Sequence, residues 1–203
     1  MEFSDLLLVF TICLIFYLYI DRNGSLYSTT NLVKVKSKVT NDVYYVHRAH
    51  SDIQQAADTM ATIELRLNTL LKYLKQNEPD HPITKLIMYR YNPDRKKENS
   101  PLNNDGTTSY TINKGEMIFY CLRDKESLKI HNINELTFVA IHELAHVGCK
   151  ERNHPPIFWI TFKWLLDKAI KAKVYEMVDY RERPFKYCGM RVSYQPYLDL
   201  RLP

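Results

Sequence analysis

The sequence predicts an α+β fold in which a small antiparallel sheet packs on helices. Three observations support this fold: an apolar stripe at helical spacing over residues 51–76, a second and almost wholly apolar helical segment over residues 132–148, and short β-rich runs paired around turns. The length of 203 residues, with 45% hydrophobic and 25% charged side chains, is typical of one globular domain with an appendage.

Two pairs of β-rich runs predict the strands. Residues 32–36 and 43–46 flank Thr40-Asn41-Asp42, and residues 109–112 and 116–122 flank Asn113-Lys114-Gly115. Short polar turns between β-branched and aromatic runs are typical of hairpins. Between the two pairs we expect a long helix over 51–76, a shorter helix over 83–91 and a polar loop over 92–108.

The segment that follows predicts a buried helix. Asn132 and Glu135 have the spacing of a capping box, and Gly148 is a natural stop. The residues between them are apolar on nearly every face, which favours burial. A last helix is expected from Pro155-Pro156 to about Lys173.

This buried helix carries His142-Glu143-Leu144-Ala145-His146. Residues at i and i+4 share one face of a helix, so both imidazoles can reach one zinc ion, while Glu143 is placed to act as a base on a water molecule. Buried polar side chains need partners, and a metal supplies one. The alternative is a pair of partly exposed core histidines without a metal.

His154 is the predicted third ligand. It stands eight residues after His146 and directly before Pro155-Pro156, so a short return loop would bring it to the entrance of the next helix. A glutamate ligand from that helix is disfavoured, because Asp167 is the only carboxylate between Arg152 and Tyr175. The competing interpretation of His154 is an exposed helix cap.

The zinc motif, His154 and the pair Phe158-Trp159 together resemble the signature of WLM-domain metallopeptidases. A longer pattern is similar to WLM-domain proteins of large nucleocytoplasmic DNA viruses and covers roughly residues 32–192. It comprises Val35-Lys36-Ser37, Asn113-Lys114-Gly115-Glu116, Phe119-Tyr120-Cys121-Leu122-Arg123 and Tyr187-Cys188-Gly189-Met190. The loop between His146 and His154 is two residues longer than the common form.

The resemblance implies a zincin-like fold over residues 32–203 and a peptidase that uses zinc (Zn2+). It also implies an edge strand that binds an extended protein or peptide substrate, for which residues 117–122 are our candidate. A hydroxyl that donates to the developing oxyanion could come from Tyr187 or Tyr180, although a structural role is commoner for either tyrosine.

The N-terminus predicts a membrane anchor over residues 1–20 and a linker over 21–31. Residues 6–20 are apolar, and as a helix they would span about 22 Å, against about 30 Å for the hydrocarbon core. A basic start, typical of a signal peptide, is missing. Because Lys and Arg follow the run and acids precede it, we expect a single-pass protein whose main domain faces the cytosol or a virion interior.

The cysteines and the charges limit the predicted compartment and partners. Cys121, Cys149 and Cys188 are scattered, so we expect no disulfide framework and a reducing compartment. Residues 21–203 hold all 28 Lys and Arg and all but two of the 23 acids, but the basic side chains are dispersed, which makes nucleic acid an improbable partner. The sequence predicts no oligomeric state.

The predicted function is therefore a membrane-tethered zinc peptidase with Glu143 as the catalytic base and His142, His146 and His154 as metal ligands. Two alternatives stay open. One is a membrane-bound, non-catalytic interaction protein stabilised by zinc, which would need a fourth ligand such as Cys149 or Cys188. The other is a protease that acts on DNA-bound proteins in crosslink repair.

Overall fold

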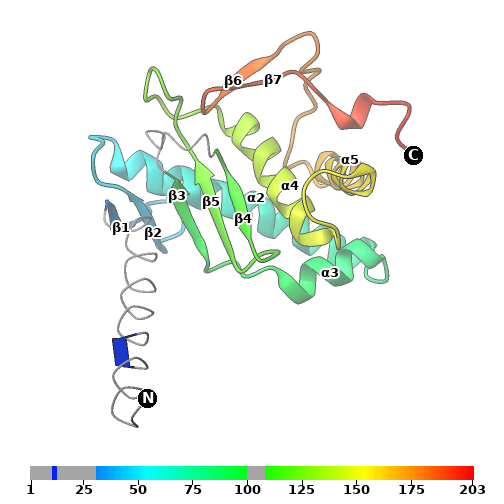
Figure 1. The fold of residues 1–203 in the computed structure, drawn as a ribbon, viewed down its shortest axis with the longest axis horizontal. Coiled ribbons are helices and arrows are strands. Elements are labelled where there is room, and N and C mark those ends of the chain that lie inside the picture. Colours follow the sequence, from blue (N-terminus) through cyan, green and yellow to red (C-terminus); the bar gives the residue numbers. More distant parts are fainter. Residues whose placement is uncertain (1–10, 13–30, 100–107) are drawn as a thin grey trace, which may run out of the picture. The chain divides into compact units, whose positions relative to one another are not determined.

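The computed structural model describes residues 11–12, 31–99 and 108–203 (Figure 1). Strands, helices and a short 3-10 helix follow one another along these residues in an α+β arrangement. In chain order they are β1 (Leu32–Lys36), β2 (Val43–His47), α2 (Ile53–Asn77), α3 (Pro82–Arg90), β3 (Lys96–Asn99), β4 (Tyr110–Ile112), β5 (Met117–Cys121), α4 (Ile133–Gly148), α5 (Pro156–Lys171), β6 (Phe185–Tyr187), β7 (Met190–Val192) and η1 (Pro196–Leu198).

The main sheet is mixed, which corrects the predicted antiparallel sheet. Its strand order is β1-β2-β3-β5-β4. β3 pairs in parallel with β2 and with β5, whereas β4 and β5 form an antiparallel hairpin with Tyr110 opposite Phe119. The turn of this hairpin includes Gly115, whose φ of 110° and close approach to the Arg90 carbonyl require glycine.

β3 makes the sheet mixed, and it lies inside the segment predicted to be a polar loop. Its sequence, Lys96-Lys97-Glu98-Asn99, lacks the β-branched and aromatic residues that mark strands. The fold buries Lys96 and Glu98 nevertheless and pairs both charges: the Lys96 Nζ lies 2.8 Å from Glu64 on α2. Ion pairs from distant segments therefore stabilise a strand whose local sequence predicts none.

The helices occur where the sequence predicts them, and α4 is the most enclosed of them. It contacts α2, α3, α5 and β4, and most of its side chains are buried. Asn132 is its N-cap, because the Asn132 side chain accepts a hydrogen bond from the Asn134 N–H at 2.8 Å. Gly148 ends α4 and lets α3 approach closely, since an added Cβ would meet Ile83 at 2.9 Å.

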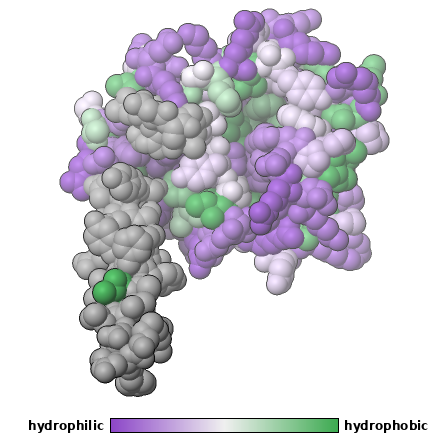
Figure 2. Space-filling view, in the orientation of Figure 1, coloured by the Kyte–Doolittle hydropathy of each residue, from purple (hydrophilic) through white to green (hydrophobic). Residues whose placement is uncertain are grey.

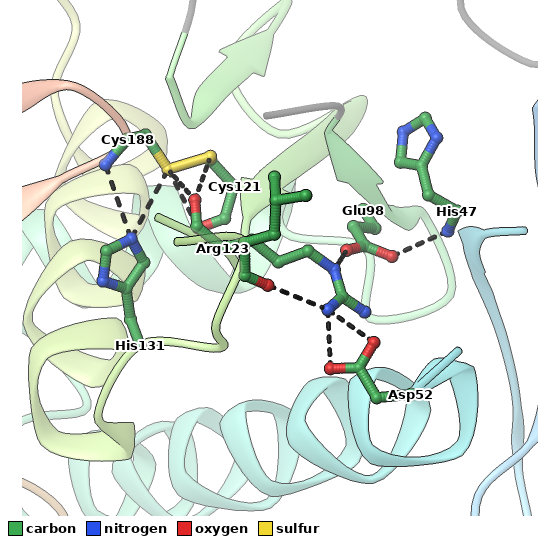
Figure 3. Close-up of polar contacts among 8 residues, drawn as sticks. His47, Asp52, Glu98, Cys121, Arg123, His131 and Cys188 are labelled. Atoms are coloured by element: carbon green, nitrogen blue, oxygen red, sulfur yellow. Dashed lines mark hydrogen bonds and ion pairs between the residues drawn. A yellow bond between two sulfur atoms is a disulfide. The ribbon is translucent and has the colours of Figure 1, made fainter. Parts of the chain in front are cut away.

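A buried ion cluster joins the sheet to the start of α2 (Figure 3). Arg123 lies between two carboxylates: its Nε is 2.9 Å from Glu98 and its Nη1 is 2.6 Å from Asp52. Glu98 also accepts a hydrogen bond from the His47 backbone N–H at 2.7 Å. Burial raises the pKa of Glu98, and the charge of Arg123 opposes that rise. The cluster connects β2, β3 and the loop after β5.

We expect Arg123→Met to be strongly destabilising. The side chain of Glu98 is fully buried, so loss of the guanidinium would leave a carboxylate without its counterion, at a cost of about 3–5 kcal/mol in the free energy of unfolding. Urea denaturation would measure this. Lys186→Met, which removes an exposed pair with Glu126, should cost less than about 1 kcal/mol. Equal costs for the two variants would contradict this account of the cluster.

The predicted membrane anchor is contradicted. Residues 1–20 fall largely outside the described residues, and among those that are described there is no helix with the length and apolar character needed to cross a bilayer. The apolar run in the sequence has 15 residues, which is fewer than the roughly 20 that a transmembrane helix requires. The predictions of a transmembrane helix and of a single-pass membrane location are therefore wrong.

Candidate metal centre

Three imidazoles converge at one end of α4. His142 and His146 come from successive turns of that helix, and His154 from the loop that leads into α5. Every pair among their candidate ligand nitrogens is within 4.8 Å, and the Nε2 atoms of His142 and His154 are 3.1 Å apart. Two nitrogens bound tetrahedrally to one zinc ion are separated by about 3.3 Å, so the cluster fits a single ion.

Phe158 packs against the rings of all three histidines. Its centroid is 4.9 Å from that of His142, 4.4 Å from that of His146 and 4.6 Å from that of His154, and Phe158 itself is fully buried. Trp159 lies 5.6 Å from His154 in a tilted arrangement. The aromatic pair that follows His154 in the sequence therefore fixes the imidazoles in place.

The surroundings keep the imidazoles neutral. Burial lowers the pKa of His142 to about 3 and that of His146 to about 4, and it also lowers the pKa of His154. The neighbouring rings add to this effect. A positive charge on His146 or His154 lowers the pKa of His142, and a positive charge on His154 lowers the pKa of His146. Neutral imidazole is the form that offers a lone pair to a metal.

Glu143 lies beside the cluster and is held by one hydrogen bond. The Thr111 hydroxyl, from β4, donates to Glu143 Oε2 at 2.7 Å. Glu143 is 3% exposed, and burial raises the pKa of its carboxyl group to about 7, while the Thr111 hydrogen bond acts in the opposite direction. A bound divalent cation would further favour the charged carboxylate. The group is thus suited to exchanging protons near neutral pH.

The cluster opens into a cleft of about 770 Å³ that runs along β4. Tyr110 and Thr111 line one side of it, and Phe138, Val139 and Phe162 supply apolar surface. β4 is the terminal strand of the sheet, while β5 lies between β3 and β4. The candidate edge strand over residues 117–122 is therefore wrong. Among the described residues β1 and β4 are the two terminal strands of the sheet, and β4 is the one whose residues line the cleft.

Tyr187 and Tyr180 were both candidate oxyanion donors, and the structure separates them. Tyr187 lines the cleft, where its hydroxyl makes a hydrogen bond with Ser109. Tyr180 is buried and hydrogen-bonded to Tyr175, outside the residues that line the cleft. Burial raises the pKa of both hydroxyl groups, so each remains protonated. Of the two, only Tyr187 is placed where a substrate could meet it.

The cysteines differ from prediction. Cys121 at the end of β5 and Cys188 in the β6–β7 turn form a disulfide, next to His131 (Figure 3). The expectation of free thiols, and the support it gave to a reducing compartment, are therefore wrong. Cys149 is a buried free thiol, and no fourth His, Cys, Asp or Glu joins the three histidines in the described parts of the chain.

The disulfide should contribute substantially to stability, because it closes a long loop. The two cysteines are 67 residues apart in sequence, and a link of this span is expected to add about 2–4 kcal/mol to the free energy of unfolding. Urea denaturation of the wild type should therefore shift to lower urea when reductant is added. The Cys121→Ala/Cys188→Ala double variant should be insensitive to reductant. A wild type whose midpoint ignores complete reduction would contradict this.

Several site residues carry no sequence signal of their own. Thr111, Ser109 and Arg191 are ordinary residues in their local context, and only the sheet pairing and the disulfide bring them to the cleft. The quoted motif segments at 113–116 and 187–190 did mark two parts of the cleft wall. The resemblance in these two segments was therefore the sequence signal for those parts of the cleft wall.

Comparisons with known proteins identify viral relatives. The chain is 34% identical over 192 residues to an uncharacterized protein of Acanthamoeba polyphaga mimivirus, covering 92% of each. It is 41% identical over 88 residues to an uncharacterized protein of Invertebrate iridescent virus 6 (41% of this chain and 47% of that protein). A similar protein of Invertebrate iridescent virus 3 is 39% identical over 84 residues, covering 40% of this chain and 50% of that protein. No family model and no solved structure matches the chain.

Proposed function

We propose that this chain, which belongs to the family of the uncharacterized mimivirus protein, is a zinc-dependent peptidase. The observation that carries the proposal is the convergence of His142, His146 and His154 next to a buried carboxylate inside a cleft. Three protein ligands leave a coordination position for solvent or substrate, as catalytic zinc sites require.

The donor set suits zinc among the common metals. Imidazole nitrogens are typical ligands of zinc, whereas magnesium and calcium prefer oxygen atoms. When bound, zinc would act as a Lewis acid towards the scissile carbonyl and lower the pKa of a coordinated water towards about 7.

Glu143 is the residue proposed to move protons. Its carboxylate accepts a proton from the attacking water and returns that proton to the leaving amine. The Thr111 hydrogen bond keeps the carboxylate oriented during both transfers. Tyr187, which lines the cleft, is our candidate donor to the oxyanion that develops on the scissile carbonyl.

The edge of β4 is the proposed substrate site. An extended peptide can add to a free strand edge through backbone hydrogen bonds. β4 is a terminal strand of the described sheet and carries Thr111, which contacts Glu143 directly. A peptide bound there would pass beside the carboxylate and the three imidazoles. The apolar surface of Phe138, Val139 and Phe162 could accept a hydrophobic side chain.

The alternatives gain no specific support. A structural zinc site requires a fourth ligand, and its two candidates are used otherwise: Cys188 is in the disulfide, and Cys149 lies outside the cluster. No feature of the described residues favours a protease specialised for DNA-bound proteins.

Metal removal tests the proposal. The purified protein should contain about one zinc per chain and cleave an unfolded protein such as reduced casein. Dialysis against a chelator should abolish cleavage, and stoichiometric zinc should restore it while magnesium should not. Complete removal of zinc without loss of activity would contradict the proposal, as would a zinc-loaded protein that cleaves no peptide in a diverse mixture.

A further inference from the structure

The charges that line the cleft are unbalanced. Among the described residues that line it, Lys114, Arg152 and Arg191 are cations, whereas Glu143 is the one carboxylate. Because Glu143 is buried beside the histidines, the accessible charge of these described lining residues is positive. The face drawn in Figure 2 is mostly hydrophilic, with apolar side chains scattered on it.

These cations lack the acidic partners that others have. Several basic side chains at the surface pair with aspartates, as Arg181 does with Asp179 and Arg201 with Asp199. Among the described residues, the Arg152 and Arg191 side chains form no ion pair, and both are exposed. A cation without a partner beside a cleft is available to a ligand.

Lys114 and Arg152 form one cationic group. Lys114 Nζ donates to the backbone carbonyl of Glu151. Burial lowers the pKa of Lys114. Among the neighbouring charges, Cys149 and Glu151 act to raise this pKa, and Arg90 and Arg152 act to lower it. Lys114 and Arg152 line the same cleft as His146 and His154.

Arg191 approaches the cleft from the other end of β4. It lies on β7, opposite Lys186 of β6, and the next residue of β6, Tyr187, is hydrogen-bonded to Ser109 just before β4 begins. Lys114 follows the end of β4 in the turn to β5. Thr111, which contacts Glu143, lies between the two ends. A peptide extended along β4 would therefore meet positive charge on both sides of the carboxylate.

We propose that the cleft selects peptides that carry acidic side chains on both sides of the scissile bond, with Arg191 binding one side and the Lys114–Arg152 group the other. This inference rests on the proposed peptidase function and adds a substrate class to it. Exposed ion pairs are individually weak, so we expect acidic flanks to raise affinity by about 10-fold over neutral flanks at low salt. The gain should shrink as salt is added, because screening weakens exposed charge pairs.

The test separates binding from cleavage. Fluorescent peptides with one apolar centre and flanks of Glu, Ser or Lys would be titrated by anisotropy into zinc-loaded Glu143→Gln protein. We expect Glu flanks to bind more tightly than Ser flanks, and Ser flanks more tightly than Lys flanks. Cleavage of the same peptides by the wild type should follow the same order in kcat/KM.

Charge-reversal variants show which cation binds which flank of the peptide. Two further peptides carry Glu on only one side of the apolar centre. Arg191→Glu should weaken one of them, and Arg152→Glu should weaken the other. Lys72→Glu makes the same change of charge on an exposed part of α2 outside the cleft and should alter neither.

Each outcome bears on one proposal or the other. Equal binding of acidic and basic peptides, or an equal loss with Lys72→Glu, would overturn the charge preference. Tight binding of acidic peptides that the wild type never cleaves would overturn the peptidase function and leave the charge preference supported.

Discussion

Replacing Glu143 by glutamine is expected to lower kcat/KM by about 10²–10⁴-fold, the contribution that general acid–base catalysis commonly makes. Glutamine keeps the size of the side chain and can still accept the Thr111 hydrogen bond through its amide oxygen, but it cannot take a proton. The variant should therefore fold normally and retain zinc. Peptide cleavage and zinc content, measured on the same preparation, would show whether the two properties separate.

A Thr111→Val variant is the matched control for that experiment. It removes the hydrogen bond to the carboxylate and leaves the proton acceptor in place, so it should lose much less activity than Glu143→Gln. If Glu143→Gln retains full activity, the role assigned to Glu143 is wrong. If Glu143→Gln loses zinc together with activity, the carboxylate supports the metal site rather than the proton transfer.

Replacing His146 by alanine is expected to remove both zinc and activity. The cluster has three imidazoles, and loss of one leaves two ligands on a site that catalytic zinc proteins build from three. Changes in residues that merely support a ligand already cost 10–100-fold in affinity, so loss of the ligand should weaken zinc binding by more than about 100-fold. Metal analysis and thermal unfolding with and without added zinc would measure this.

His50→Ala is the control, because His50 lies outside the metal cluster. The wild type and His50→Ala should gain thermal stability on adding zinc, whereas His146→Ala should not, since a ligand that binds only the folded state stabilises it. Zinc bound with unchanged affinity by His146→Ala would show that the three-histidine site is wrongly assigned.

The helices could be predicted because helical patterns are local. The stripe over 51–76 became α2 (Ile53–Asn77), and the capped apolar segment became α4 (Ile133–Gly148). Spacing within one helix also placed His142 and His146 on one face without any knowledge of the rest of the fold. His154 could be predicted because only a short loop separates it from α4, which limits how far it can lie from His146.

The strands were harder, because their partners lie far away in sequence. β3 was missed, since its two buried charges, Lys96 and Glu98, are stabilised by Glu64 and Arg123 from other segments. Its parallel pairing placed β5 inside the sheet and left β4 at the edge. The disulfide was missed for a related reason: Cys121 and Cys188 meet only after the β6–β7 hairpin folds back onto the sheet.

The sequence by itself determined the local geometry of the candidate site, because His142, Glu143 and His146 lie within two turns of one helix and helix geometry fixes their relation. Tertiary structure decided what surrounds that chemistry. It made β4 a terminal strand beside the cleft, brought Thr111 to Glu143, and brought Arg191 and Lys114 to the lining of the same cleft. These positions depend on strand pairings and on a disulfide that join segments far apart in the sequence. A local sequence pattern does not indicate which distant segments will pair.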